Sequence, residues 1–158
     1  MSDFPRDQMT ALILAGGRGS RFDGADKGLL DFMGLPMVAH VLKALANQVH
    51  LVLVSANRHL EQYEAFGVPV VRDRLADYQG PLAGIEAGLS ICPTAYMAVF
   101  PCDAPLLDSR LLANLYQTLE RTNANIVYAT SRQGDDTYPE PTFALIRSEE
   151  HTSELQSH

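Results

Sequence analysis

The sequence is poor in the features that mark several classes of protein. It has two cysteines, Cys92 and Cys102, in 158 residues, which excludes a disulfide framework and fits a reducing compartment. No apolar run approaches the roughly 20 residues that a membrane-spanning helix needs. A signal peptide's basic and then apolar pattern is missing from the first residues, MSDFPRDQ, so we expect a cytoplasmic protein. Internal repeats and low-complexity linkers are missing as well.

Positive charge is also scarce. Lysine and arginine number 12 against 19 acidic residues, and the net charge of −7 argues against broad nucleic-acid binding. The apolar share of 46% and the charged share of 20% are those of an ordinary globular chain. The length suits one domain that can bury a sizeable core.

Two common phosphate-binding motifs are incomplete. The apolar run over 10–14 predicts a buried strand, and a glycine-rich segment, GGRGS, follows it at 16–20. A P-loop requires a lysine after its second glycine, whereas Lys27 stands between Asp26 and Gly28. A dinucleotide fingerprint requires a third glycine three residues after Gly19, and Phe22 stands there. The chain therefore contains neither motif.

A basic glycine loop is nevertheless present. Arg18, Arg21 and Lys27 bring three cations into ten residues of an acidic chain. Glycines let the backbone approach an anion closely, and successive N–H groups form a concavity that binds one. The segment predicts a site for a nucleotide phosphate. The alternative is an ordinary strand-to-helix turn with incidental basic residues.

Apolar runs alternate with amphipathic segments, as in parallel sheets covered by helices. Pro36 suits the first turn of a helix, and Ser109 is a candidate helix cap. The polar segment 131–138 predicts a loop. We expect strands over 10–14, 51–55, 68–71, 96–100, 126–130 and 142–146, and helices over 36–47, 60–66, 83–91 and 109–121.

Several polar residues follow predicted strands. In open α/β sheets, ligands bind beyond the carboxyl ends of the strands, where the glycine loop, Asn57, Asp73 and Asp103 should gather. Asp103 follows a buried strand and is a candidate ligand for Mg²⁺, which prefers one or two carboxylates together with phosphate oxygens and waters. The alternatives are a turn aspartate at 103, a turn residue at 57, and an ion pair of Asp73 with Arg72 or Arg74.

The segments LAGGRGSRF at 14–22 and DKGLL at 26–30 together resemble the amino-terminal signature of nucleotidyltransferases. Within that superfamily the chain most resembles the molybdenum cofactor guanylyltransferases, from about residue 10 to residue 146. Four further segments carry this resemblance: VSANRH at 54–59, DRLADY at 73–78, GPLAG at 80–84 and PCDAP at 101–105. It implies an α/β, three-layer, Rossmann-like nucleotidyltransferase fold, with a mostly parallel sheet, helices on both faces and a truncated carboxyl end.

The resemblance also implies a reaction. It is the transfer of GMP from GTP to molybdopterin with release of pyrophosphate, assisted by Mg²⁺. Cytidylyl relatives usually read LAAG in the first motif and lack GPLAG, so this chain points to GTP. The alternatives are a cytidylyl or sugar-phosphate nucleotidyltransferase, or a non-catalytic nucleotide-binding fragment. Implied partners are GTP, molybdopterin and, transiently, cofactor-delivery proteins or molybdoenzyme chaperones, with no nucleic acid and no membrane.

The same resemblance assigns residues to roles. Lys27, Arg21 and Asp103 are the expected catalytic residues, and Asp103 is the expected metal ligand. His59 matches a family position but receives no chemical role. The expected nucleotide-binding residues are Leu14, Ala15, Gly16, Gly17, Arg18, Lys27, Asn57, Asp73, Gly80, Pro81, Leu82, Gly84 and Asp103.

The last twelve residues, RSEEHTSELQSH at 147–158, differ in character from the rest. They show neither strand alternation nor a helical stripe, and they resemble the translation of a sequencing-library adapter. We therefore expect an incomplete nucleotidyltransferase domain over 1–146 and an artefactual tail over 147–158. The alternative is a genuine polar tail. Relatives continue past this point, so the activity of the parent enzyme and that of this chain are separate questions.

Overall fold

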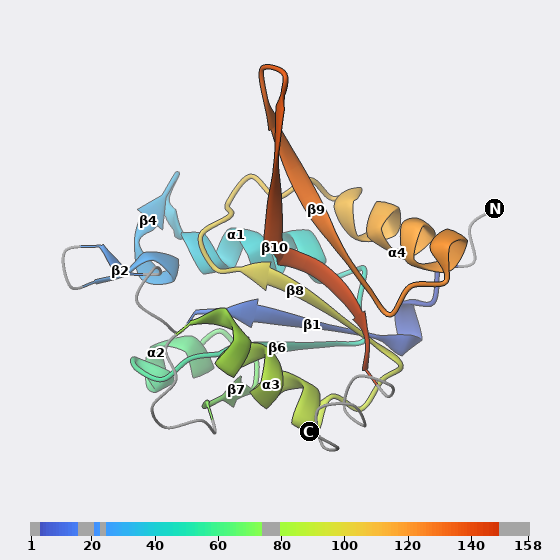
Figure 1. The fold of residues 1–158 in the computed structure, drawn as a ribbon. Coiled ribbons are helices and arrows are strands. Elements are labelled where there is room, and N and C mark those ends of the chain that lie inside the picture. Colours follow the sequence, from blue (N-terminus) through green and yellow to red (C-terminus); the bar gives the residue numbers. More distant parts are fainter. Residues whose placement is uncertain (1–3, 16–20, 23–24, 74–79, 149–158) are drawn as a thin grey trace.

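A six-stranded mixed sheet organises the protein (Figure 1). The computed structural model describes residues 4–15, 21–22, 25–73 and 80–148. The strands lie in the order β7-β6-β1-β8-β10-β9. The order departs from the order along the chain because parallel neighbours require crossover connections.

Four parallel strands form the first part of the sheet: β1 (Met9–Leu14), β6 (Leu51–Ser55), β7 (Val70–Val71) and β8 (Tyr96–Pro101). Leu12 of β1 stands in register with Leu53 of β6 and Val99 of β8. Every residue of β1 is buried, as a strand covered on both faces requires. The predicted strand over 51–55 has the observed bounds, and the one predicted over 68–71 shortens to Val70–Val71.

Helices cover both faces of this sheet. On one face, α1 (Met37–Leu45), α2 (Leu60–Glu64) and α4 (Leu111–Thr122) pack against alternate residues of β1, which include Ala11 and Ile13. On the other face, α3 (Pro81–Ile91) covers Leu12 and Leu14 (Figure 1). The alternation of the two clusters along β1 is the period of two that a pleated strand imposes. The predicted three-layer α/β class is confirmed.

A long hairpin extends beyond the sheet where a loop was predicted (Figure 1). Strands β9 (Ile126–Gln133) and β10 (Asp136–Arg147) pair antiparallel and enclose Gly134 and Asp135 as a two-residue turn. Gly134 has φ +64°, the left-handed conformation that such turns need. The prediction of a loop over 131–138 was wrong because cross-strand pairing, rather than an apolar face, holds these polar residues in strands.

Two helix starts differ from the prediction. Helix α4 begins at Leu111, and the backbone N–H of Arg110 donates to Oδ1 of Asp108 at 2.8 Å, so Ser109 is not the cap. Arg110 precedes the first residue of the helix, and no side chain among the described residues caps this start. Pro36 precedes the first residue of α1 rather than lying in its first turn.

Short elements that the sequence did not predict lie before β1 and between β1 and α1. They are η1 (Arg6–Gln8), β2 (Arg21–Phe22), β3 (Ala25–Asp26), η3 (Lys27–Leu29), β4 (Asp31–Phe32) and β5 (Leu35–Pro36). Elements of two or three residues carry no periodic signal, and pairing between neighbouring segments creates them.

The last strand of the described chain, β10, lies inside the sheet between β8 and β9. Strand β10 continues one residue past Ile146, to Arg147, whose backbone N–H donates to the carbonyl of Asn125 at 2.9 Å. Residues 149–158, which form most of the predicted artefactual tail, lie outside the described residues. None of the helices in the described ranges is both long and apolar enough to cross a membrane.

Candidate functional site

Among the described residues, Asn57 and Asp103 of the predicted site follow the carboxyl ends of β6 and β8, next to the end of β1. Backbone hydrogen bonds continue past these ends: the Ala15 N–H donates to the Ser55 carbonyl at 2.8 Å, and the Cys102 N–H donates to the Leu14 carbonyl at 3.1 Å. Because β1, β6 and β8 are parallel neighbours, the loops that follow them lie at one edge of the sheet. Asn57 and Asp103 each stand two residues beyond such a strand end.

Lys27 and Asp103 form the charged pair of this edge. The Lys27 Nζ lies 3.9 Å from the Asp103 Oδ2, and their side chains are 34% and 33% exposed. An ion pair this open to solvent contributes little to stability. Its cation and its carboxylate therefore both stay accessible to a charged ligand.

Close packing between two turns brings this pair together. Gly28 lies so near the turn after β8 that an added Cβ would stand 2.9 Å from the Cys102 Cβ and from the Tyr63 hydroxyl. Only a residue without a side chain allows the Lys27 turn to approach Asp103 in this way. Burial raises the pKa of the Cys102 thiol to about 12, with the Asp103 carboxylate adding to the shift. Cys102 is therefore a neutral residue that packs in the core.

Asn57 and Asp73 bind each other across the loops after β6 and β7. The Asn57 Nδ2 donates to the Asp73 Oδ2 at 2.8 Å, and the Asp73 backbone N–H donates to the Asn57 Oδ1 at 2.9 Å. The other carboxylate oxygen of Asp73 is buried and has no hydrogen-bond partner. In the described part of the chain no ion pair joins Asp73 to Arg72, and Arg74 lies outside it. An oxygen of this kind can accept a hydrogen bond from a ligand.

The GPLAG segment forms the start of α3. Gly80 has φ +132° and precedes Pro81, the first residue of the helix, and the Leu82 side chain is 63% exposed. At Gly84 an added Cβ would stand 2.6 Å from the Ser55 Oγ and 2.9 Å from the Leu14 Cδ2. Gly84 therefore has a packing role: it lets α3 lie close to β1 and β6.

The remaining predicted residues divide into three groups. Leu14 and Ala15 are 7% and 2% exposed, so their side chains belong to the core. Arg21 pairs its backbone with Asp26 in the β2–β3 ribbon. Gly16, Gly17 and Arg18 lie outside the described residues.

Two exposed side chains, Arg58 and His59, contact the buried Asp26 next to Lys27, and the sequence indicated no chemical role for either of them. Asp26 is 4% exposed; its Oδ2 lies 2.6 Å from the His59 Nδ1, and its Oδ1 lies 3.6 Å from an Arg58 guanidinium nitrogen. The sequence signal available was the run Asn57-Arg58-His59 after a strand, with an aspartate directly before the lysine. Nothing in either segment alone indicates that they meet.

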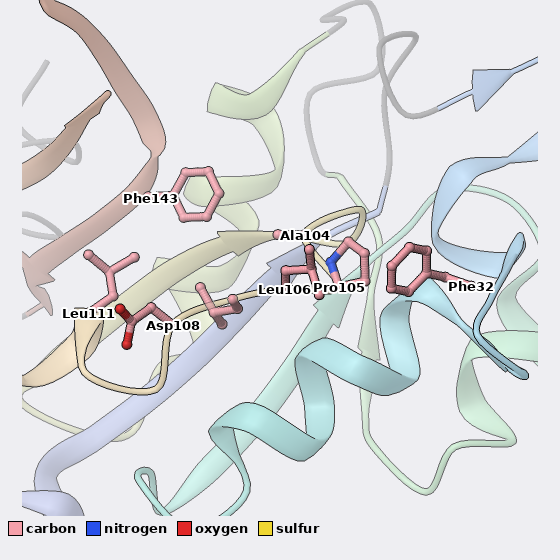
Figure 2. A pocket seen from close by; sticks show the side chains of 8 residues that line it. Phe32, Ala104, Pro105, Leu106, Asp108, Leu111 and Phe143 are labelled. Atoms are coloured by element: carbon pink, nitrogen blue, oxygen red, sulfur yellow. The ribbon is translucent and has the colours of Figure 1, made fainter. Parts of the chain in front are cut away.

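An apolar hollow lies beside the Asp103 turn (Figure 2). Its volume is about 360 Å³, and Phe32 borders one side of it while Phe143 borders another (Figure 2). The lining comes from four separate parts of the chain, so the hollow has no sequence signal. Its residues are Phe32, Ala104, Pro105, Leu106, Leu107, Asp108, Leu111 and Phe143.

No group of three or more histidine, cysteine, aspartate or glutamate side chains stands ready for a metal within the described ranges. Asp103 offers a single, partly exposed carboxylate. That donor fits Mg²⁺, which takes few protein ligands when phosphate oxygens and waters complete its shell. It does not fit a closed structural zinc site, which needs four protein ligands.

The fold and this edge define the class of protein, an α/β nucleotidyltransferase fold. A solved structure, the molybdopterin-guanine dinucleotide biosynthesis protein A from Archaeoglobus fulgidus, superposes with a TM-score of 0.68 at 23% identity. The superposition covers 94% of this chain and 71% of that one. At this identity the likeness establishes the fold alone.

Sequence similarity identifies the family. The family model described as the MobA-like NTP transferase domain matches residues 11–157. A molybdenum cofactor guanylyltransferase of Ralstonia pickettii is 48% identical over 147 residues, which are 90% of this chain and 72% of that protein. One of Acidovorax ebreus is 48% identical over 145 residues, 88% of this chain and 69% of that protein. The chain therefore belongs to the MobA-like NTP transferase family.

Proposed function

We propose that the protein is a guanylyltransferase that transfers GMP from GTP to molybdopterin. The accessible Lys27–Asp103 pair at the carboxyl edge of the sheet carries this proposal. A second support is that relatives at 48% identity are named molybdenum cofactor guanylyltransferases. A cation and a carboxylate that a ligand can reach are the two charges that a triphosphate and its counter-ion require.

The proposed reaction is a displacement at phosphorus. An oxygen of the molybdopterin phosphate forms a bond to the α-phosphorus of GTP, the bond from that phosphorus to the β-phosphate oxygen breaks, and pyrophosphate leaves with the electron pair. The protein contributes position and charge rather than a covalent intermediate. Lys27 would bind phosphate oxygens and stabilise the charge on the leaving group. Arg21, with Arg18, would add bidentate contacts to the triphosphate.

Asp103 would hold Mg²⁺ at this site. When bound, that ion neutralises charge on the phosphates. Lys27 would also have a second role. Its ammonium, 3.9 Å from the Asp103 carboxylate, partly neutralises that negative charge and so weakens its repulsion of the incoming triphosphate. Both residues thus prepare one edge of the sheet for an anionic substrate.

The nucleoside would lie toward Asn57, Asp73 and the start of α3. The unpartnered Oδ1 of Asp73 supports this placement, since a buried acceptor without a donor is costly until a ligand supplies one. The Asn57–Asp73 pair orients that oxygen with two hydrogen bonds. Gly80, Pro81, Leu82 and Gly84 would present backbone to the base, with Leu14 to Gly17 completing the pocket.

The other inferences from the resemblance stay proposals. We infer that molybdopterin is the acceptor, that a cofactor-delivery protein or molybdoenzyme chaperone contacts the enzyme transiently, and that the enzyme works in the cytoplasm. The dinucleotide product must then be consumed by an enzyme that uses such a cofactor.

Pyrophosphate release tests the proposal. The full chain is incubated with molybdopterin, Mg²⁺ and one of GTP, CTP or ATP, and Asp103→Ala is compared with Asp136→Ala, a matched change at the exposed hairpin tip. We expect release that is selective for GTP, at least about 100-fold weaker in Asp103→Ala and unchanged in Asp136→Ala. Selective release from CTP would reassign the protein to a sister activity. GTP binding without any release would make it a nucleotide-binding module and overturn the proposal.

A further inference from the structure

The cluster of Asp26, Arg58 and His59, of which only Asp26 is buried, has no part in the roles described above. Asp26 is almost fully buried, and a buried carboxylate must be paired or hydrogen-bonded. Because a carboxylate only accepts, the proton of the 2.6 Å contact sits on the His59 Nδ1, which donates to the Asp26 Oδ2. Arg58 adds a longer, half-exposed charge contact at 3.6 Å. The histidine is thus the principal partner of Asp26.

His59 adopts a strained backbone conformation to make this contact. Its φ is +54° and its ψ is +38°, in the left-handed region, at the residue that precedes α2. A residue with a Cβ loses about 1–2 kcal/mol there relative to the right-handed conformation. The histidine side chain makes no cap hydrogen bond to α2, so the helix itself does not require it. The surrounding contacts of His59, among them the 2.6 Å bond to Asp26, must offset this strain.

Asp26 is joined directly to Lys27. Asp26 ends β3, Lys27 begins η3, and the Leu30 N–H closes that turn on the Lys27 carbonyl at 3.1 Å. On the other side of the lysine, Gly28 packs against Cys102. Lys27 therefore stands between the Asp26–His59 contact and the close packing of Gly28 against the Cys102 side chain, and its Nζ lies 3.9 Å from the Asp103 Oδ2.

The same histidine belongs to the loop of another predicted ligand residue. Asn57, Arg58 and His59 are consecutive after β6, and Asn57 binds Asp73. The His59–Asp26 contact therefore connects the loop proposed to hold the nucleoside with the turn proposed to hold the phosphates. The longer Arg58–Asp26 contact of 3.6 Å joins the same two segments of the chain.

We propose that His59, acting through Asp26, is a positioning residue that sets Lys27 at the distance from Asp103 and from the nucleoside loop that guanylyl transfer requires. The proposal rests on the proposed function. Misplacing a reacting or charge-stabilising group by about 1 Å can slow a reaction by about 100-fold, so a support of this kind affects the rate. His59 itself need not touch the substrate.

Replacement of His59 by glycine and by asparagine tests the positioning role. Glycine relieves the backbone strain but leaves the buried Asp26 carboxylate without its principal partner, so His59→Gly should unfold at a lower temperature than the parent, and kcat for pyrophosphate release, measured well below that temperature, should fall by about 10–100-fold. His59→Asn should recover most of the loss, because asparagine tolerates φ > 0 and carries an N–H donor near the place of Nδ1. The matched control is Asn123→Gly, which makes the same backbone change at φ +54° far from the site, and it should leave kcat unchanged.

Hydrogen exchange gives a reading that does not depend on activity. The backbone amides of 26–30 should exchange faster in His59→Gly than in the parent chain, and not in Asn123→Gly or His59→Asn. Unchanged exchange in His59→Gly overturns the proposal whatever happens to kcat. A lowered unfolding temperature that His59→Asn does not restore also overturns it, by making the ring structural. If the parent chain releases no pyrophosphate from GTP, the proposed function fails. Faster exchange of the amides of 26–30 in His59→Gly would in that case still show that His59 holds the Lys27 turn in place.

Discussion

Asp26 and Asp103 carry the same side chain in opposite surroundings. Asp26 is 4% exposed and bound by a histidine, whereas Asp103 is 33% exposed and faces an ammonium at 3.9 Å. A carboxylate that is already satisfied supports its neighbours, and one that is open to solvent can still bind a ligand. Residue type alone predicted the role of neither; position after a strand indicated Asp103.

Burial of the Cys102 thiol makes stability depend on alkaline pH. Its pKa is about 12 in the folded protein against 9.0 for the free group, so above pH 9 the unfolded chain loses this proton and the folded chain keeps it. The stabilisation is fully present below pH 9 and declines as pH rises toward 12. The burial-raised pKa of Tyr63 adds a decline of the same sign.

We therefore expect the urea midpoint to fall between pH 8.5 and about 10.5, and to fall less steeply in Cys102→Ala. Urea titrations at several pH values, read by circular dichroism, measure both slopes. Equal slopes for the parent chain and Cys102→Ala would contradict the buried neutral thiol.

At the scale of the elements, two close approaches decide how helices and turns meet the sheet. Gly28 brings η3 against the turn after β8, and Gly84 brings α3 against β1 and β6. Both glycines lie in segments that the sequence marked as functional. The structure gives them packing reasons that hold with or without a ligand.

The approach of α3 predicts a sharp penalty at Gly84. In Gly84→Ala the new methyl group would stand 2.6 Å from the Ser55 Oγ, so the helix or the strand must shift. We expect a loss of about 1–3 kcal/mol in the free energy of unfolding, measured by urea denaturation. Ser90→Ala, an exposed change on the same helix, should cost far less. Similar losses for both variants would mean that α3 adjusts without strain.

The elements themselves were predicted unevenly. The apolar runs at 51–55 and 96–100 became β6 and β8 almost residue for residue, because a strand covered on both faces must be apolar throughout. The polar hairpin over 126–147 was divided wrongly, since half of its residues face solvent. The turn residues Gly134 and Asp135 were the overlooked signal. The Asp26–His59 contact had none, because the two residues are 33 positions apart.

At the scale of the whole molecule, Arg147 joins three elements at the amino-terminal edge of the sheet. Its guanidinium donates to the Glu120 carboxylate at 2.6 Å and to the Ala124 carbonyl at 2.9 Å, and it lies 5.6 Å from the centre of the Tyr96 ring. Strand β10, helix α4 and strand β8 thus meet at one side chain. These contacts lie in a residue that the sequence had grouped with the tail.

We expect Arg147→Ala to lower the free energy of unfolding by about 1–3 kcal/mol, because it removes two hydrogen bonds and a cation–π contact. Arg147→Lys should restore only part of this, since an ammonium lacks the planar fork. Denaturant titration measures the changes, and Arg121→Ala, which removes an exposed arginine of α4, is the matched control. A loss in Arg147→Ala no larger than that of the control would show that the three elements hold together without it.

The sequence by itself determined the α/β class and the succession of the central strands and helices along the chain. It also determined the edge of the sheet at which Lys27, Asn57, Asp73 and Asp103 gather. These properties follow from apolar runs, glycines and the residues after strands, all of which are local. Only the tertiary structure decided which of these side chains meet. The Lys27–Asp103 pair, the Asn57–Asp73 bonds and the Asp26–His59 support each join residues far apart in the chain. Such contacts depend on how closely the backbones approach, and no local pattern records that distance.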